Sequence, residues 1–416
     1  MKPQWNVESE VALNQLPAEG TVVETAPSKE PRTPREWLRE NLFSTTTNSI
    51  LTIIVGLISG FLAYRILGWV FFRAEWEVVQ ANFRLFMVGR FPIEEVWRVW
   101  VSVYYLALLS GLSWALSGRR LRWDGIRKVR RPVVAALAIA LFFFLVKSPL
   151  VWALTAGAAA AIVVGVFLGR AIPRGGLPRL VRAGWLIAFP FVIVILQVAG
   201  GVSPLLWGGL VLNVLVAVVG IVLSFPFGIL LALGRRSTFP AMRVVSVGFI
   251  EIVRGAPLFA WLLFGQYLLP FLLPPGIRLP EIVRAMIMFT IFSAAYVAEI
   301  VRGGLQGVHH GQFEAGRALG LSTTKLTRLV VLPQALRNTI PAMISHFISL
   351  FKDTSLLAVI AFVEVLRVAR VSSSASRFVG TSRQTLIFAA LIFWIVAFSM
   401  SRWSQRLEQR LGVGER

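Results

Sequence analysis

Residues 205–234 read LLWGGLVLNVLVAVVGIVLSFPFGILLALG and contain no charged side chain. A helix needs roughly 20 apolar residues to cross the hydrocarbon core of a bilayer, so this stretch predicts a transmembrane helix. The rest of the 416-residue chain has the same character, with 56% hydrophobic residues, 15% charged residues and a mean hydropathy of +0.73. Soluble chains carry about 25% charged residues. The composition therefore argues against a soluble enzyme and predicts an all-α integral membrane protein.

Apolar segments recur along the chain and predict about ten transmembrane helices. The segment 132–146 is short for a membrane span, so a count of eight or nine is left open. The ten segments are 50–72, 96–117, 132–146, 149–168, 183–200, 205–234, 257–274, 282–302, 340–363 and 385–400.

The basic residues predict the orientation of these spans. The chain has 42 Lys and Arg against 20 Asp and Glu, and its net charge is +22. The basic residues collect in alternate loops, as cytoplasmic loops require, so both termini are predicted to be cytoplasmic. No basic run is interleaved with aromatics in the way that single-stranded nucleic acid needs, which argues against nucleic-acid binding. The loop 364–384 is basic on the predicted outer side, and our interpretation is a surface helix. The predicted inner segments are 118–131, 169–182, 235–254, 303–339 and the C-terminal tail from Arg402.

The N-terminal part divides into a polar tail and an extra membrane region. Residues 1–49 are polar and contain five prolines, which predicts a disordered or loosely ordered tail with a short surface helix at 35–43. The tail lacks the pattern of a signal peptide, so we expect the first span to be retained. Residues 50–200 form the predicted extra transmembrane region. The chain has no Cys and three His, which leaves little material for a metal centre.

One polar stripe is predicted in the span 340–363. Asp353 lies beside Lys352 in an apolar helix, where an isolated carboxylate is costly unless it is paired or hydrated. His346 and Ser349 share the helix face of Asp353, which predicts a polar stripe that faces inward. A pair of Lys352 and Asp353 that only locks two helices together is the alternative.

A second polar stripe is predicted in the span 282–302. Ser293, Tyr296 and Glu299 recur every three residues on one helix face, and Arg302 follows three residues after Glu299. Because Glu299 and Arg302 approach the inner surface, a gate or an interfacial ion pair is an equally good interpretation of these two residues.

The inner segment 303–339 contains helical patterns of its own. Residues 312–320 read QFEAGRALG, and residues 321–333 read LSTTKLTRLVVLP. Ser322 is a predicted N-cap, so we expect a helix, a sharp turn and a second helix. Small residues in the first part let another backbone approach closely, which suits a docking element. They are Ala315, Gly316, Ala318 and Gly320.

This segment resembles the cytoplasmic coupling loop of ABC-importer permeases. The family pattern is Glu-Ala-Ala, three residues, Gly, nine residues, Ile, one residue and Leu-Pro. The chain has the same spacing, with Gly316 in the position of the second Ala and Val330 in the position of Ile. The matching residues are Glu314, Ala315, Gly316, Gly320, Leu332 and Pro333.

Further stretches resemble the polar amino-acid branch of these permeases. The resemblance covers roughly 205–410 and implies a C-terminal five-helix type I ABC-importer permease core that contains the coupling loop 303–339. The N-terminal half looks most like the M-type subunit of the general L-amino acid permease. The quoted stretches are SFPFG at 224–228, VRGAPL at 253–258, SAAYVAEIVRGG at 293–304 and FKDTSL at 351–356.

The resemblance implies a transport subunit that moves L-amino acids across the bacterial cytoplasmic (inner) membrane. ATP and Mg²⁺ would be used by separate ABC ATPase subunits, since this sequence has no phosphate-binding P-loop and no cofactor is expected on it. The other implied partners are a second identical or homologous permease, an extracytoplasmic amino-acid-binding protein and the lipid bilayer.

The resemblance also implies two sets of functional residues. The ATPase-coupling set consists of the coupling-loop residues Glu314, Ala315, Gly316, Gly320, Leu332 and Pro333 together with Arg254. The substrate-path set consists of Asp353, Lys352, Thr354, Ser355, Ser293, Tyr296 and Glu299. A zwitterionic amino acid needs an anion to bind its ammonium group and donors or cations to bind its carboxylate, and the two polar stripes provide both kinds of partner.

Two other functions are left open by the sequence. A permease of this type could carry another small polar solute, such as an opine or a polyamine. A membrane channel or scaffold subunit without coupled transport is a second alternative, and the coupling-loop pattern argues against it. A secondary carrier would require an inverted repeat, and the two halves show no convincing similarity.

Overall fold

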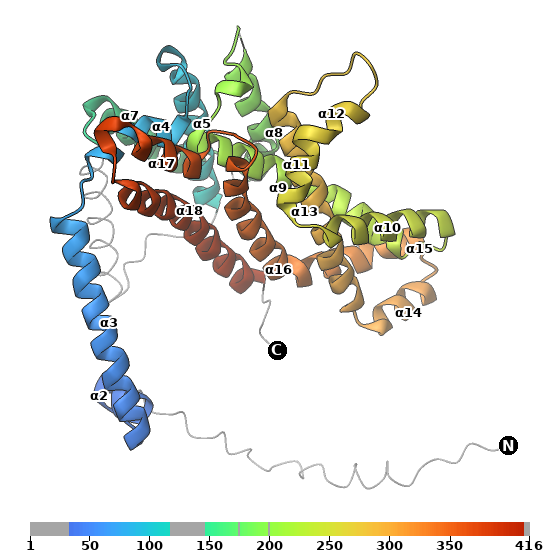
Figure 1. Cartoon of the computed structure of the whole chain (residues 1–416). Coiled ribbons are helices and arrows are strands. Elements are labelled where there is room, and N and C mark those ends of the chain that lie inside the picture. Colours follow the sequence, from blue (N-terminus) through green and yellow to red (C-terminus); the bar gives the residue numbers. More distant parts are fainter. Residues whose placement is uncertain (1–32, 117–145, 174, 199, 412–416) are drawn as a thin grey trace. The chain divides into compact units, whose positions relative to one another are not determined.

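The computed structural model describes residues 33–116, 146–173, 175–198 and 200–411, and every regular element in these ranges is helical (Figure 1). The prediction of an all-α protein is confirmed. The chain divides into two compact units, Met1–Ala74 and Glu75–Arg416.

In the first unit, a short helix and a long helix follow each other. α2 (Pro34–Leu42) begins with a capping box, in which Thr33 and Glu36 each accept a hydrogen bond from the backbone N–H of the other. α3 (Thr46–Phe72) has 27 residues, or about 40 Å, and none of them is buried within the chain. The placement of α2 at a membrane surface stays a prediction.

The second unit begins with a helical layer that precedes the predicted core. Its elements are α4 (Glu77–Val88), η1 (Ile93–Glu95), α5 (Trp97–Leu116), α7 (Pro149–Ala171), α8 (Leu177–Gln197) and η2 (Pro204–Leu206). The backbones of α5 and α7 pack closely because Gly111 and Gly165 have no side chain at the contact. Arg98, which is almost fully buried, donates from Nη1 to the carbonyls of Ile195 and Val198 at the end of α8. These contacts hold α7 and α8 on either side of α5.

The remaining elements form the C-terminal part of the second unit. They are α9 (Gly209–Arg235), α10 (Pro240–Gly255), α11 (Leu258–Leu263), the π-helix η3 (Phe264–Leu268), α12 (Leu269–Leu272), α13 (Glu281–Gln306), α14 (His310–Ala318), α15 (Thr323–Leu326), the π-helix η4 (Thr327–Val331), α16 (Leu332–Asp353), η5 (Thr354–Ala358), α17 (Val365–Ser374), η6 (Ser376–Phe378) and α18 (Ser382–Leu411).

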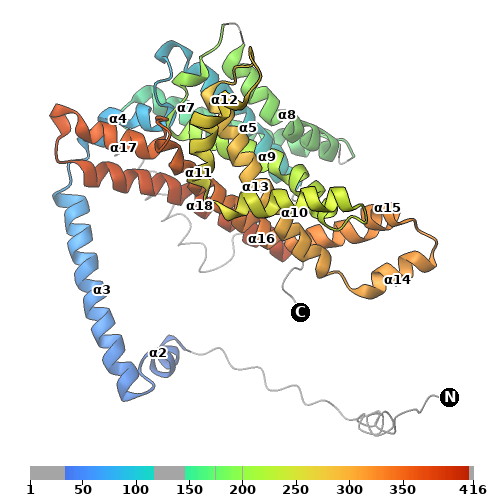
Figure 2. The same ribbon diagram turned by 45° about the vertical axis from the view of Figure 1, so that its right-hand side comes forward.

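α13 is the central helix of this part. It runs parallel to α9, and Gly228 of α9 lies against Val297 with no room for a side chain. It runs antiparallel to α16, because Gly304 packs on Ala335 while Ser293 meets His346. Consequently, the end of α13 that leads to α14 and the end of α16 that leads to α17 lie at opposite ends of the bundle (Figures 1 and 2).

Seven of the described helices are long and apolar enough to cross a membrane: α3, α5 with η1, α7, α8, α9, α13 and α18. α10 followed by α11 and α12 would make an eighth span, bent by 102° at its break. The described residues thus account for seven or eight of the about ten expected spans. The predicted span 132–146 lies outside these residues, and α16 is absent from the seven because its 22 residues include many polar ones.

Two predicted segments take a different form in the structure, and a third agrees with its prediction. The inner loop 235–254 contains the helix α10, because Ser246, Ile250 and Val253 form a face that is buried in the bundle. The span 257–274 is one arm of a bent pair rather than a straight helix. The loop 364–384 contains α17, which is capped by the Glu364 side chain and agrees with the helix proposed there.

Candidate translocation path and coupling segment

The coupling segment folds as the sequence predicts, as a helix, a turn and a second helix. α14 ends at Ala318, and the chain reverses at Gly320, whose φ of +73° is a conformation that glycine adopts without strain. The N–H of Leu321 donates to the carbonyl of Gly316, which closes the end of α14. The Ser322 side chain then accepts from the N–H of Lys325, which confirms the predicted N-cap of α15.

One side of α14 is attached to the protein and the other is free. Gly316 is buried, and a Cβ there would lie 2.3 Å from Leu326 of α15, so glycine sets the close approach of the two helices. Glu314, Ala315 and Leu319 are exposed on the free side, and Leu319 is 80% exposed. A large exposed leucine next to small residues is typical of a helix that docks into another protein.

The other predicted coupling residues belong to other elements than α14. Leu332 and Pro333 begin α16, where Leu332 is half-buried against the bundle and Pro333 is exposed. Arg254 lies at the end of α10, just before the 102° bend, and it contacts Glu299 rather than α14. The structure therefore joins Arg254 to a predicted path residue.

A buried polar cluster connects α9, α13 and α16. The Ser293 hydroxyl lies 2.8 Å from the hydroxyl of Ser224 and 3.0 Å from Nε2 of His346. The His346 ring stacks on Tyr296 at a centroid distance of 5.5 Å. The structure thus brings the predicted path residues Ser293 and Tyr296 together with two residues from neighbouring helices.

An ion cluster around Glu299 continues this polar face toward the coupling segment. The Glu299 carboxylate lies 2.6 Å from Arg235 of α9, 2.9 Å from Arg302 of α13 and 3.7 Å from Arg254 of α10. Arg235 also pairs with Glu251 at 3.1 Å. The guanidinium of Arg254 lies over the Tyr296 ring at 5.5 Å, so the ion cluster and the serine cluster meet at Tyr296.

The predicted residues after His346 are separated from both clusters. Asp353 is seven residues beyond His346 on α16, or about 10 Å along the helix axis. Lys352 is exposed and Asp353 and Ser355 are half-exposed. Thr354 is fully buried, and its hydroxyl accepts a 2.9 Å hydrogen bond from Nδ2 of Asn213.

Thr354 belongs to a second buried network, at the end of the bundle opposite to Glu299. Asn213 Nδ2 also lies 3.3 Å from Oε2 of Glu364, and Asn213 Oδ1 accepts from the N–H of Val365. The Glu364 carboxylate caps α17 by accepting from the N–H groups of Leu366 and Arg367. Since this network leaves Thr354 inaccessible, we place its role in the fold and not among groups that a solute can touch.

Several of these contacts could not be predicted from the sequence. Arg235 and Glu299 are 64 positions apart, and Asn213 and Glu364 are 151 positions apart, so helix spacing relates neither pair. Ser224 lies in the quoted stretch SFPFG, yet only the close contact of α9 with α13 brings it to Ser293.

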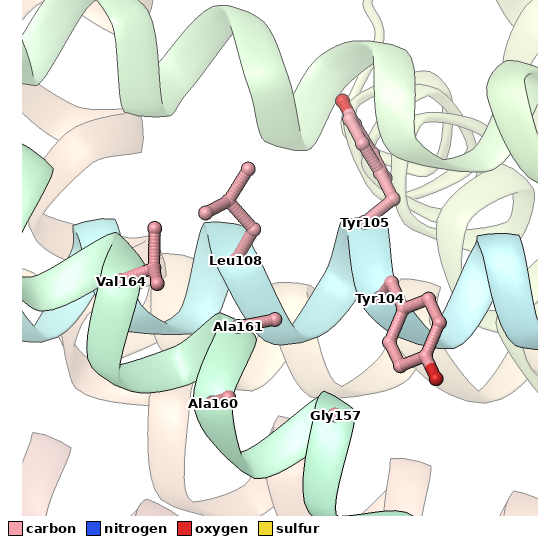
Figure 3. Close-up of a pocket in the computed structure, with 7 residues that line it drawn as sticks. All are labelled: Tyr104, Tyr105, Leu108, Gly157, Ala160, Ala161 and Val164. Atoms are coloured by element: carbon pink, nitrogen blue, oxygen red, sulfur yellow. The ribbon is translucent and has the colours of Figure 1, made fainter. Parts of the chain in front are cut away.

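A groove of about 560 Å³ lies elsewhere, between α5 and α7 (Figure 3). Its two tyrosine hydroxyls, on Tyr104 and Tyr105, donate to the carbonyls of Leu154 and Gly184, so neither hydroxyl proton is free for a solute. The polar path residues are absent from its lining. The groove is lined by Tyr104, Tyr105, Leu108, Gly157, Ala160, Ala161 and Val164.

Comparisons with known proteins agree with this architecture. Residues 224–413, from Ser224 in α9 onward, match the family described as binding-protein-dependent transport system inner membrane component. The chain is 34% identical over 398 residues to the inner membrane amino-acid ABC transporter permease protein YhdY of Escherichia coli K12, covering 91% of this chain and 93% of that protein. It is also 34% identical to the glutamate/glutamine/aspartate/asparagine transport system permease protein BztC of Rhodobacter capsulatus, covering 90% of this chain and 93% of BztC.

Shorter relatives match only part of the chain. The probable glutamine ABC transporter permease protein GlnP of Bacillus subtilis is 37% identical over 205 residues, which are 49% of this chain and 93% of GlnP. A solved amino acid ABC transporter crystallised with histidines is 30% identical, with a TM-score of 0.44, over 49% of this chain and 92% of that chain. Given the match to full-length relatives, this chain belongs to the family of inner-membrane permeases of binding-protein-dependent amino-acid ABC transporters.

Proposed function

We propose that this chain is the permease subunit of an ABC importer that carries L-amino acids inward across the bacterial cytoplasmic membrane. The observation that carries the proposal is α14, which is held to α15 through Gly316 while its opposite face is exposed. A groove on an ABC ATPase subunit would receive this face. ATP and Mg²⁺ are used by that subunit, and this chain acts without a cofactor and without catalysis.

The polar residues of α13 and α16 support a translocation path next to a second permease subunit. Ser345, Ser349 and Lys352 are exposed on α16. Polar groups at membrane depth face a water-filled cavity or another protein, because lipid cannot hydrate them. An identical or homologous permease that covers this face would enclose a path between the two subunits, with Ser355 and Asp353 near one end and Glu299 near the other.

The two ends of this path have different chemistry. Asp353 provides a carboxylate for an ammonium group, and the arginines around Glu299 provide partners for a carboxylate. Alternating access would open these ends in turn, driven by movement of α14. The basic residues of the alternate loops support a cytoplasmic location for α14 and for both termini, and an extracytoplasmic binding protein delivers the amino acid at the Asp353 end.

The experiment compares Gly320→Asp with Gly320→Asn in the complete transporter, reconstituted with its ATPase, partner permease and binding protein. A Cβ at Gly320 would meet no described atom within 4 Å, and Asn and Asp tolerate positive φ similarly, so the variants differ mainly in charge. We expect Gly320→Asp to lose amino-acid-stimulated ATP hydrolysis and uptake together, while Gly320→Asn retains more of both.

Three outcomes would change the conclusion. Full activity in Gly320→Asp would show that this turn does not approach the ATPase. Uptake by wild type without any ATPase would favour an uncoupled channel. Stimulation by an opine or a polyamine, in the absence of any response to L-amino acids, would keep the importer and change its substrate.

A further inference from the structure

The last helix of the chain continues beyond its apolar part. α18 has 30 residues, or about 45 Å, whereas the hydrocarbon core of a bilayer is roughly 30 Å thick. The apolar stretch of α18 ends at Met400, and the helix continues through Arg402 to Leu411. The final turns of α18 are therefore expected at the boundary between hydrocarbon and water.

Contacts with two other helices give the direction of α18. Phe388, in the second turn of α18, packs edge to face on Phe86 of α4 at 4.9 Å. The Phe393 ring lies 5.6 Å from that of Phe351, which is two residues before the end of α16. Later residues therefore lead away from α4, and both views show α18 begin beside α17 and end beside α16 (Figures 1 and 2).

Three side chains spaced four residues apart share one exposed face near the end of α18. The rings of Trp394 and Phe398 are exposed and stack at a centroid distance of 4.9 Å. The guanidinium of Arg402 lies over the Phe398 ring at 5.2 Å. An arginine in this position keeps its stem on an apolar surface and its charge at the boundary of the apolar stretch.

A second arginine extends this face by one turn. Arg402 and Arg406 are both exposed, and neither forms an ion pair with a residue that the structure describes. Glu408 lies on the opposite side of the helix, where it accepts a hydrogen bond from the hydroxyl of the buried Ser404. The face thus carries two cations that no described carboxylate neutralises. We call Trp394, Phe398, Arg402 and Arg406 the α18 ladder.

We propose that the α18 ladder binds the headgroup phosphate of an anionic phospholipid. Its residues change from apolar to aromatic to cationic along the helix, which is the order of hydrocarbon, interface and headgroup in one leaflet. Two guanidinium groups one turn apart can both donate to a phosphate. Trp403 is 61% exposed beside them, at the depth where indole rings favour the interface.

The choice of leaflet rests on the proposed function, which places the coupling segment and the C-terminal end of α18 in the cytoplasm. The cytoplasmic leaflet is rich in anionic lipid, and each basic side chain near its surface strengthens binding. An acidic segment of another subunit is the competing occupant of this face.

The first test measures lipid binding to the complete transporter in neutral detergent by native mass spectrometry, while phosphatidylglycerol is titrated. Arg402→Gln and Arg406→Gln should each raise the lipid concentration for half occupancy by about fivefold. Phe398→Leu keeps both charges and should raise it by about two- to fourfold, since the ring under Arg402 is lost. Phosphatidylcholine, which has no net charge, should not compete.

The matched control is Arg179→Gln/Arg182→Gln, which removes two exposed arginines from the start of α8. They lie in a predicted inner segment as well, and neither has a printed partner ring comparable to Phe398. This control should leave the half-occupancy concentration unchanged. An equal loss in the control and in the ladder variants would overturn the proposal, because any basic patch would then hold the lipid. Unchanged binding in Phe398→Leu and in both arginine variants would overturn it too.

The second test identifies the occupant directly. A photo-crosslinking residue at Trp403, in vesicles that contain phosphatidylglycerol, should add the mass of one phospholipid to this chain. The same residue at Leu319 on α14 should not. A crosslink from position 403 to an ATPase or to the second permease would overturn the lipid site in favour of a protein contact.

Amino-acid uptake by the same vesicles separates this proposal from the proposed function. If wild type imports amino acids but binds phosphatidylglycerol no better than phosphatidylcholine, the lipid site is disproved and the proposed function stands. If the ladder binds phosphatidylglycerol but no amino acid stimulates ATP hydrolysis or uptake, the proposed function fails, and the lipid site stands without its assignment to a leaflet.

Discussion

Glu299 and Glu364 are two carboxylates that are shielded from solvent by different kinds of partner. Glu299 meets three arginine side chains that come from α9, α10 and α13, and its side chain stays 17% exposed. Glu364 is fully buried and meets two backbone N–H groups and the amide of Asn213. Glu299 is held by side chains from separate helices. Glu364 is held by backbone N–H groups, which cannot move without unfolding the start of α17.

This difference indicates which end of the bundle can rearrange. Ion pairs between partly exposed side chains contribute little to stability and exchange partners readily. A buried carboxylate that is held by backbone donors is costly to release, because the donors lose their partners as well. The Glu299 end, next to the bend after α10, is therefore suited to rearrange within this chain, and the Glu364 end is suited to move as a rigid body.

The largest effect is expected from Gly89→Ala, at the fixed end. The new Cβ would meet the Gly208 backbone at 2.3 Å, in a backbone conformation with a φ of +64°. Strain and overpacking together should lower the free energy of unfolding by about 2–5 kcal/mol, seen as reduced thermal stability in detergent. Gly276→Ala is the control, since its φ is +91° and its Cβ would meet nothing within 4 Å. Equal losses for both variants would show that the contact between α4 and α9 is unimportant.

Glu364→Ala should come next, with a loss of about 2–4 kcal/mol, because the cap of α17 is removed and buried donors are left without acceptors. The same thermal measurement applies. Glu364→Asp keeps an acceptor in place and should recover part of the stability. A change smaller than about 1 kcal/mol in Glu364→Ala would mean that water replaces the carboxylate, and the fixed character of this end would be disproved.

Glu299→Gln should change transport more than stability. Because the ion pairs are partly exposed, the free energy of unfolding should change by less than about 1 kcal/mol. The three arginines would lose their common anion, so ATP hydrolysis without substrate should rise while uptake per ATP falls. The measurement compares both rates in proteoliposomes. A large loss of stability with normal coupling would reverse the assignment of the two ends.

The smallest effect is expected from Arg254→Ala. Its contact with Glu299 is the longest of the three at 3.7 Å, so stability should change by about 0.5 kcal/mol or less. Coupling should weaken less than in Arg235→Ala, whose contact is 2.6 Å. Measuring Arg254→Ala in the Glu299→Gln background tests the pair directly. Effects that simply add would show that Arg254 acts independently of Glu299, and its contact with the Tyr296 ring would then be the one to test.

Features that depend on neighbouring residues were predictable from the sequence. The turn at Gly320, the N-cap at Ser322 and the long apolar helices α9 and α13 all follow from local composition and spacing, and the structure confirms them. The stripe of Ser293, Tyr296 and Glu299 was also recognisable. Its partners were not, because Ser224, His346 and Arg235 lie on other helices.

Hydropathy was a poorer guide where a helix buries a polar face or breaks. α10 was predicted as a loop because its arginines resemble an inner connection, while its buried face packs on α9 and α13. α16 was predicted to continue to 363, yet the α-helix ends at Asp353 and a 3₁₀ turn follows. The network of Asn213, Thr354 and Glu364 determines the path of the chain there, and its members are far apart in the sequence.

The sequence by itself determined that this protein is helical, has apolar spans for a membrane and carries a turn at Gly320 between two short helices, because composition and local spacing suffice for those properties. Only the tertiary structure decided that Arg254 and Arg235 share Glu299, that Thr354 is closed off from a path, and that α4 packs on α17. Contacts between distant segments depend on how helices pack, and helix packing is set by shape across the whole bundle, which no single stretch of sequence encodes.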